Sequence, residues 1–196
     1  IGVRLVGSEM CIRDRLDSPF VGNAKFLKMV EMFGNDVTTI DCTFFREVKE
    51  DSLAEALERI KTDSEDAIRS GAGHIILTDK MQNSDKVSIP MILATSAVHS
   101  WLTKRGLRTF CSINVQSAEC IDPHYFAVLV GCGATTVNAY LAQDSIADRI
   151  KRNLLTGTIT ENTKRYQEAI DQGLLKIMAK MGISVISSYR LSLIHI

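Results

Sequence analysis

The side chains best placed for chemistry are polar residues that lie at the ends of short apolar segments. They are Asp41, Asp79, Lys80, Gln116, Ser117 and Asn138. Carboxyl and amino groups can transfer protons, and amides and hydroxyls can line a polar pocket or channel. The same residue types also cap helices and satisfy loop backbone. Both interpretations are open from sequence, and the second is the more common one for residues of this kind.

Cysteines and histidines form no recognisable metal-binding or nucleophile motif. The spacing of Cys42, Cys111, Cys120 and Cys132 fits no zinc or iron–sulfur pattern. Each is expected to be a small buried hydrophobic residue in a reducing compartment. The histidines at 74, 99 and 124 are scattered, and the sequence contains no His-Glu-x-x-His and no nucleophile elbow. The sequence therefore predicts no catalytic residue and no metal ligand.

One glycine-rich stretch, Gly131-Cys132-Gly133-Ala134, has the composition of a phosphate-binding loop. Such a loop should follow a strand and begin a helix. Here the preceding residues are helical in pattern and the following ones are typical of a strand. Gly133 is therefore predicted to end a helix, and no cofactor-binding residue is predicted in this chain.

The elements that would position these residues alternate between helices and strands. The expected strands are 37–41, 75–78, 107–115 and 135–138, with helices at 23–33, 53–71, 90–106 and 122–133. A polar loop is expected at 81–88. Strands spaced by roughly thirty residues with helices between them predict right-handed βα repeats around a parallel sheet. We expect an α/β fold that forms part of a TIM-like barrel, with neighbouring strands adjacent in chain order.

After Tyr140 the pattern becomes helical. A short helix is expected at 144–154, followed by a long helix that Thr158 and Glu161 begin as a capping box. The apolar stripe of the long helix contains Tyr166, Ile170, Leu174, Ile177 and Met181. A new strand is expected at 183–187. We expect much of this stripe to lack a partner within the chain, and the chain to self-associate as a result.

Both ends of the chain are expected to be foreign to the protein. One DNA element, read in opposite orientations, can encode both Glu9–Asp14 and Leu191–Ile196. That element resembles the transposase adapter of sequencing libraries. Residues 1–15 and 191–196 are therefore predicted to be adapter-derived and to fall outside fold reasoning. Within them, 1–13 and 191–196 are expected to pack against nothing. The natural part is then 16–190.

Composition excludes several functional classes. The chain has 23 basic and 23 acidic residues and a formal net charge of zero. Nothing in this balance favours binding to nucleic acid or to an anionic membrane. No apolar run has the length of a membrane-spanning helix. The expected location is the cytoplasm.

Several stretches, taken in order, are more specific than any single motif. They are Leu16–Pro19, Ile40–Phe44, Ser88–Ala94, Gly106–Thr109, His124–Ala134, Val137–Ala142 and Gly173–Ser184. Together they resemble the large subunit of glutamate synthase, from the end of its central domain into its FMN-binding domain. The last stretch contains the most specific part, Lys-Ile-Met-x-Lys-Met-Gly-Ile-Ser. Ala179 and Tyr125 depart from the residues usual in the family, Ser and His. The resemblance assigns 16–142 to the central domain, and 143–190 to a connection and the start of the FMN-binding domain.

The resemblance implies a multidomain enzyme. It would release ammonia from glutamine, pass it through an internal tunnel and add it to 2-oxoglutarate by reduction with FMN and an iron–sulfur cluster. The catalytic elements of the family lie outside this chain, so it would act as scaffold between two active sites and be inactive alone. Its partners would be the remaining domains of the same chain and the small (beta) subunit. Two alternatives are part of a free-standing FMN- or phosphate-binding βα-barrel enzyme, and a non-catalytic βα interaction module.

Overall fold

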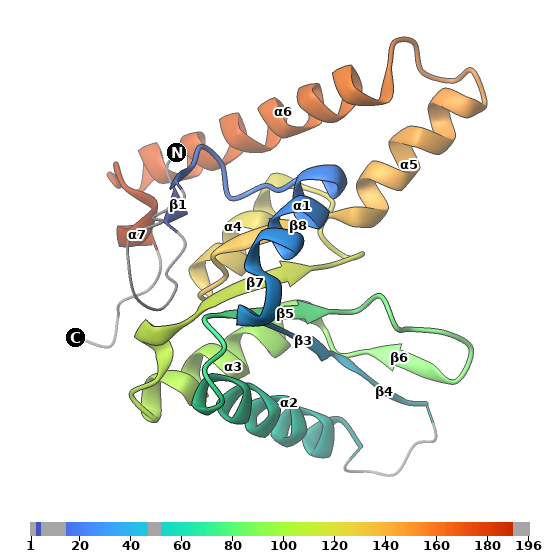
Figure 1. Ribbon diagram of the computed structural model, residues 1–196. Coiled ribbons are helices and arrows are strands. Elements are labelled where there is room, and N and C mark those ends of the chain that lie inside the picture. Colours follow the sequence, from blue (N-terminus) through green and yellow to red (C-terminus); the bar gives the residue numbers. More distant parts are fainter. Residues whose placement is uncertain (1–2, 5–14, 47–51, 190–196) are drawn as a thin grey trace.

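The computed structural model describes residues 3–4, 15–46 and 52–189. Its centre is a parallel sheet of β3 (Val37–Asp41), β5 (His74–Thr78), β7 (Ser112–Gln116) and β8 (Thr136–Asn138). The strands lie side by side in the order β3-β5-β7-β8 (Figure 1). This confirms the predicted α/β fold with βα repeats. Strand order without a reversal is that of consecutive barrel strands, whereas a doubly wound sheet has a switch point.

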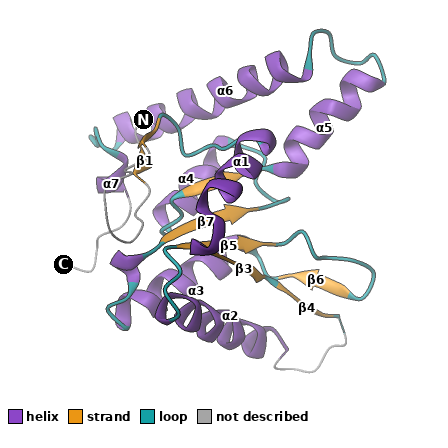
Figure 2. Cartoon of the chain, in the orientation of Figure 1, coloured by secondary structure: helices purple, strands orange, loops and turns teal. Residues whose placement is uncertain are grey.

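A helix lies between each two consecutive strands of this sheet, as the pattern predicted, and further helices precede and follow the sheet (Figure 2). They are α1 (Asn23–Phe33), α2 (Ser52–Arg69), α3 (Met91–Lys104), α4 (Pro123–Gly131), α5 (Tyr140–Lys151), α6 (Ile159–Lys180) and α7 (Ile186–Tyr189). Single 3₁₀ turns are η1 (Gly34–Asp36) and η2 (Arg108–Phe110). Asp122 begins α4 by accepting from two backbone N–H groups, with Pro123 in the first turn. Thr158 and Glu161 form the predicted capping box of α6.

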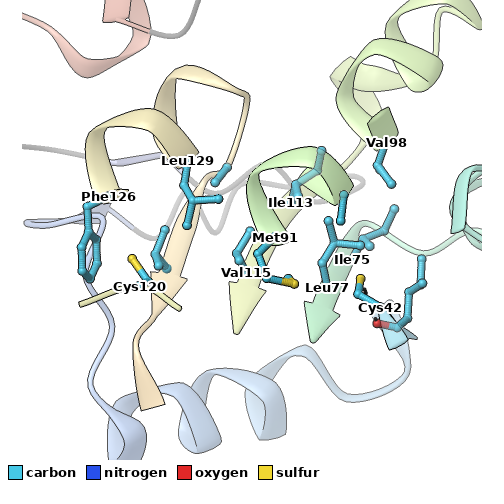
Figure 3. Close-up of a cluster of buried hydrophobic side chains, with 14 of the residues drawn as sticks. Cys42, Ile75, Leu77, Met91, Val98, Ile113, Val115, Cys120, Phe126 and Leu129 are labelled. Carbon is cyan, nitrogen blue, oxygen red and sulfur yellow. Dashed lines mark hydrogen bonds between the residues drawn. The ribbon is translucent and has the colours of Figure 1, made fainter. Parts of the chain in front are cut away.

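The main core lies between the sheet and helices α2, α3 and α4. Alternate strand residues such as Ile75, Leu77, Ile113 and Val115 are fully buried on this face (Figure 3). Helix residues including Met91, Val98, Phe126 and Leu129 pack against them. Because side chains alternate along a strand, each strand commits every second residue to this core.

The opposite face of the sheet carries a smaller apolar cluster. Ile76 lies there with Phe26 and Met29 of α1, all of them buried. The remaining residues of this face on β7 and β8 are polar; Asn114 and Asn138 are buried, and Gln116 is half-buried. Buried polar side chains need hydrogen-bond partners, and the site described below supplies them.

A segment near the start of the described chain extends the sheet beyond β8. Phe20 forms a parallel bridge with Val137, whose N–H donates to Pro19 O at 2.8 Å. The Val21 N–H donates to Val137 O at 2.9 Å. Ser18 donates to Asp171 Oδ1 of α6 at 2.5 Å. One edge of the sheet is thus covered by the chain itself.

The expectation that α6 lacks a partner is wrong. Ile170, Leu174 and Met178 are buried, and α6 packs along α4. The two helices approach closely because residue 173 is glycine: a Cβ there would lie 2.5 Å from Pro123 Cβ. Of the predicted stripe, Met181 is the residue left exposed. Helix α4 and the segment at Phe20 cover the apolar stripe of α6. The periodicity of a single helix could not identify these partners.

Other differences are local. Residues 183–187 were expected to be a strand, but Ile186–Tyr189 form α7. The expected loop at 81–88 contains β6 (Lys86–Ser88), which pairs antiparallel with β4 (Thr43–Phe45). The strand expected from 107 begins with η2 and becomes extended at Ser112. Short apolar segments do not distinguish strand from helix by periodicity alone, which explains the first and third differences.

The chain ends lie mostly outside the described residues. Within the N-terminal segment, β1 (Val3–Arg4) pairs antiparallel with β2 (Arg15–Leu16). The expectation that the N-terminal residues pack against nothing is therefore wrong for Val3 and Arg4. Residues 5–14 and 190–196, on which the adapter prediction mainly falls, are outside the described part. The adapter origin of both ends stays a prediction.

Candidate functional site

Two of the six predicted side chains, Gln116 and Asn138, meet in one hydrogen-bonded row at the carboxyl edge of the sheet. Gln116 Oε1 accepts from Thr78 Oγ1 at 2.9 Å, and Gln116 Nε2 donates to Asn138 Oδ1 at 3.2 Å. Asn138 Nδ2 in turn donates to Val21 O and to Asn23 Oδ1, each at 2.9 Å. The row therefore links β5, β7 and β8 to the segment that covers the sheet edge. Its amides are used within the protein.

A second polar row lies on the same face, nearer the amino ends of the strands. His74 Nδ1 is 2.6 Å from Ser112 Oγ, and Asn114 Nδ2 donates to Ser112 Oγ at 3.1 Å. Thr136 Oγ1 donates to Asn114 Oδ1 at 2.7 Å. None of these residues was among the predicted site residues. The polar residues at 112, 114 and 116 alternate with apolar ones, and that alternation was the available signal.

Asp79 follows β5 and is completely buried. Its Oδ2 accepts from the Ala118 N–H at 2.8 Å and from Ser117 Oγ at 3.4 Å. Its Oδ1 has no hydrogen-bond partner among the described residues. Burial raises the pKa of Asp79, and the hydrogen bonds from Ala118 and Ser117 oppose that rise. Asp79 and Ser117 therefore meet as a pair that ties the end of β5 to the loop after β7.

Lys80 is exposed beside this pair. Its Nζ lies 5.8 Å from the centre of the Tyr140 ring, within the range of a cation–π contact. Burial, and then the charge of Asp79, raises the pKa of Tyr140 to about 12. Tyr140, the first residue of α5, was not among the predicted site residues, and no local pattern distinguished it.

Asp41 lies apart from the others, at the end of the edge strand β3. Its Oδ1 accepts from Thr43 Oγ1 at 2.7 Å, and its Oδ2 is 3.5 Å from Lys86 Nζ. It borders a cleft of about 580 Å³ between α2 and the β4–β6 ladder, lined by Asp41, Thr43, Phe44, Phe45, Ser52, Glu55, Ala56, Arg59 and Lys86. Arg59 Nη2 donates to Asp41 O and Thr43 O, and Arg59 Nη1 lies 3.6 Å from Asp63 Oδ2.

Glu119 was also missed from sequence. Its Oε2 accepts from the Met91 N–H at 3.1 Å and from the Tyr125 hydroxyl. A carboxylate at the first residue of α3 is stabilised by the helix dipole and the free N–H groups there. Glu119 therefore joins the loop after β7 to the starts of both α3 and α4.

The glycine-rich stretch ends α4, as predicted. Gly133 has φ of 111°, and the N–H groups of Gly133 and Ala134 donate to Val130 O and Leu129 O. A Cβ on Gly133 would lie 2.3 Å from His99 Nδ1. The space that a phosphate would need is occupied by a protein side chain, so this stretch does not fit a phosphate group.

The cysteines are mostly buried. Cys42, Cys111 and Cys120 are buried and Cys132 is half-buried. Burial raises the pKa of the Cys42 thiol to about 12, which leaves it protonated and unreactive at neutral pH. Within the described ranges, no group of three or more His, Cys, Asp or Glu side chains is arranged to hold a metal ion. In the same ranges, no helix is long and apolar enough to cross a membrane.

The buried carboxyl of Asp79 predicts a pH dependence of stability. Its folded-state pKa lies above the unfolded value of about 3.9. The folded state therefore holds the proton more tightly, and this contribution to stability is lost as pH rises through the folded-state pKa. Asp79→Asn should flatten the fall in unfolding free energy above pH 4 in urea titrations. Asp66→Asn, on the exposed face of α2, should leave that slope unchanged. An equal slope in the wild type and Asp79→Asn would contradict the prediction.

Comparison with known proteins gives a consistent family. The model of the glutamate synthase central domain matches residues 5–195. The large chain of NADPH glutamate synthase from Azospirillum brasilense is 51% identical over 177 residues, which cover 90% of this chain and 12% of that protein. NADH glutamate synthase from Schizosaccharomyces pombe is 34% identical over 94% of this chain and 9% of its own length.

Two further matches cover less of this chain. Ferredoxin-dependent glutamate synthase 1 from Arabidopsis thaliana is 39% identical over 75% of this chain and 10% of its own length. Among solved structures, Eimeria tenella DHODH in complex with ferulenol aligns with a TM-score of 0.49 and 12% identity, over 79% of this chain and 36% of that one.

The three curated relatives are each matched along only 9 to 12% of their length. The family match, in contrast, extends over nearly the whole of this chain. The chain belongs to the glutamate synthase central domain family.

Proposed function

We propose that this chain is a scaffold segment of a glutamate synthase large chain. The whole enzyme would transfer the amide nitrogen of glutamine to 2-oxoglutarate and give two molecules of L-glutamate. FMN and an iron–sulfur cluster would belong to the full-length enzyme and not to this segment. The segment would hold the ammonia-releasing and synthase sites at a fixed separation, so that ammonia is not lost to solvent. Alone, it would be inactive.

The observation that carries the proposal is a match along nearly all of this chain but along only 9 to 12% of each relative. The polar rows support a structural role, since the side-chain amides of Gln116 and Asn138 form hydrogen bonds within the protein. No observation of this kind supports either alternative, a free-standing βα-barrel enzyme or a separate interaction module.

The finer assignments belong to the same proposal. Residues 16–142 would be central domain, and 143–190 the connection and start of the FMN-binding domain. The partners would be the remaining domains of the polypeptide and the small (beta) subunit, in the cytoplasm. The relatives' names include NADPH, NADH and ferredoxin forms, and the proposal does not depend on which of them donates electrons.

The proposal is tested by following nitrogen in the full polypeptide that contains this chain. With amide-labelled glutamine and 2-oxoglutarate, little label should leave the unmodified enzyme as free ammonia. Gly173→Val, and the milder Gly173→Ala, would push α6 away from Pro123 without touching a predicted catalytic group. We expect more free labelled ammonia, while glutaminase activity and synthesis from added ammonia persist. Ala169→Val, on the exposed part of α6, is the control. No additional leakage from the milder variant would refute the scaffold role.

The chain itself is expected to bind no FMN. The glycine-rich stretch ends a helix, and His99 occupies the space beside Gly133. Flavin fluorescence should stay unquenched when micromolar FMN is titrated with purified chain. Saturable quenching would mean that the cofactor site lies within these residues.

A further inference from the structure

The hairpin of α5 and α6 has a tip that extends away from the sheet (Figure 1). The tip, residues 149–165, contains the end of α5, the connecting loop and the start of α6. Two aliphatic side chains are presented there: Leu154 is 70% exposed and Ile159 is 53% exposed. An exposed aliphatic residue in isolation needs no explanation. These two residues, however, are presented by a loop whose conformation is held by specific contacts.

The loop is held in one conformation by specific contacts. Asn162 Nδ2 donates to Thr156 O at 2.9 Å and to Thr158 O at 3.0 Å, and the Asn162 side chain is buried. The Leu154 N–H donates to Arg149 O at 2.9 Å. Asn153 and Gly157 take positive φ values of 58° and 92°. Because these contacts order the backbone in advance, a partner would lose little conformational entropy on binding the tip.

The same tip is rich in basic residues. The tip contains Arg149, Lys151, Arg152, Lys164 and Arg165. Arg152 pairs with Asp148, and Lys164 lies 4.0 Å from Glu168. Glu161 is engaged in the capping box. Among the described residues Arg149, Lys151 and Arg165 form no ion pair, although the first two also complement the dipole of α5. A partner surface with carboxylates around an apolar pocket would match this arrangement.

We propose that the hairpin tip docks, through Leu154 and Ile159, into a carboxylate-rimmed apolar pocket on another domain of the same polypeptide. This proposal rests on the proposed function, in which the chain works inside a much longer protein. The matched segment is 12% and 9% of the length of two relatives, so those relatives are about eight to eleven times longer than the segment. A second copy of the tip is a poor partner because two basic tips repel each other. The tip would then be an anchor that fixes this segment against its neighbour.

The test places a photo-crosslinking residue in the full polypeptide. Leu154→p-benzoylphenylalanine, after illumination, should join the tip to a peptide of the same polypeptide outside this chain, as read by mass spectrometry. The same replacement at Lys176, an exposed position of α6 away from the tip, should give no such product. An intermolecular product of two tips, or no product from position 154, would overturn the proposal.

Charge substitutions give a second measurement. Leu154→Asp should leave the melting temperature of the isolated chain within about 1 °C, because the side chain is exposed. In the full polypeptide it should increase hydrogen exchange at 154–159, and Leu175→Asp, at an exposed position outside the tip, should not. Unchanged exchange would refute the anchor. Failure here would leave the nitrogen-leakage result intact, since that result depends on the α4–α6 contact.

Discussion

Replacing Phe126 by alanine is expected to lower the free energy of unfolding by about 3–5 kcal/mol. The Phe126 side chain is fully buried between α4 and the sheet (Figure 3). Its ring centre lies 6.0 Å from that of Phe20, which in turn contacts Tyr166 edge-on at 5.6 Å. Truncation would remove the contact that joins α4, α6 and the segment bridging β8. The loss combines the transfer of apolar surface with the cavity left behind.

Urea unfolding of the purified chain measures this effect. Phe110→Ala is the matched control, because Phe110 is 62% exposed and its truncation should change stability by less than about 0.5 kcal/mol. We expect the midpoint of the Phe126 variant to fall well below that of the control with a similar dependence on urea. Equal midpoints would show that the aromatic cluster does not stabilise the fold.

Removal of the Arg108 side chain is expected to cost about 2–4 kcal/mol. Arg108 Nε donates to His99 Nδ1 at 3.0 Å, and its two terminal nitrogens donate to Cys111 O and Gly133 O at 2.7 Å each. Burial lowers the pKa of the guanidinium. Arg108→Ala would remove the donor of these three hydrogen bonds, in a part-buried site that ties α3 and the end of α4 to the residue before β7.

A neighbouring arginine provides the control for this prediction. Arg105 lies over the Trp101 ring and pairs with Glu65 at 3.2 Å, but its side chain is 48% exposed. Arg105→Ala should therefore cost no more than about 1 kcal/mol. Thermal or urea unfolding of the two variants compares a part-buried network with a surface contact. If both cost the same, the network at Arg108 contributes no more than an exposed ion pair.

Local features of the chain were enough to predict the order and type of most elements. The caps at Asp122 and Thr158, and the helix end at Gly133, were predicted and are present. Each depends on contacts between residues a few positions apart, so a short stretch of sequence contains the whole interaction. The parallel order of the four strands followed from the spacing of these elements and from the rule that consecutive βα units lie side by side.

The candidate site was predicted only in part. The sequence placed these residues at the carboxyl ends of parallel strands, and the structure pairs Gln116 with Asn138 and Asp79 with Ser117 there. It did not show that Asp41 would pair with Lys86 beside a separate cleft. That position depends on the β4–β6 ladder, whose antiparallel pairing joins residues about forty positions apart. The composition of Lys86–Ser88 suits a polar loop as well as a short strand, so local sequence could not predict this pairing.

The amino-acid sequence by itself determined where helices begin and end, which strand residues are apolar, and the family to which the chain is related. Only the tertiary structure decided which surfaces meet. Ser18 contacts Asp171 across 153 positions, and Asn138 contacts Asn23 across 115. These contacts cover one sheet edge and bury one side of α6, against the expectation for that helix. The physical reason is that an amphipathic helix specifies an apolar face but not its partner, which depends on shape and distance in the folded chain.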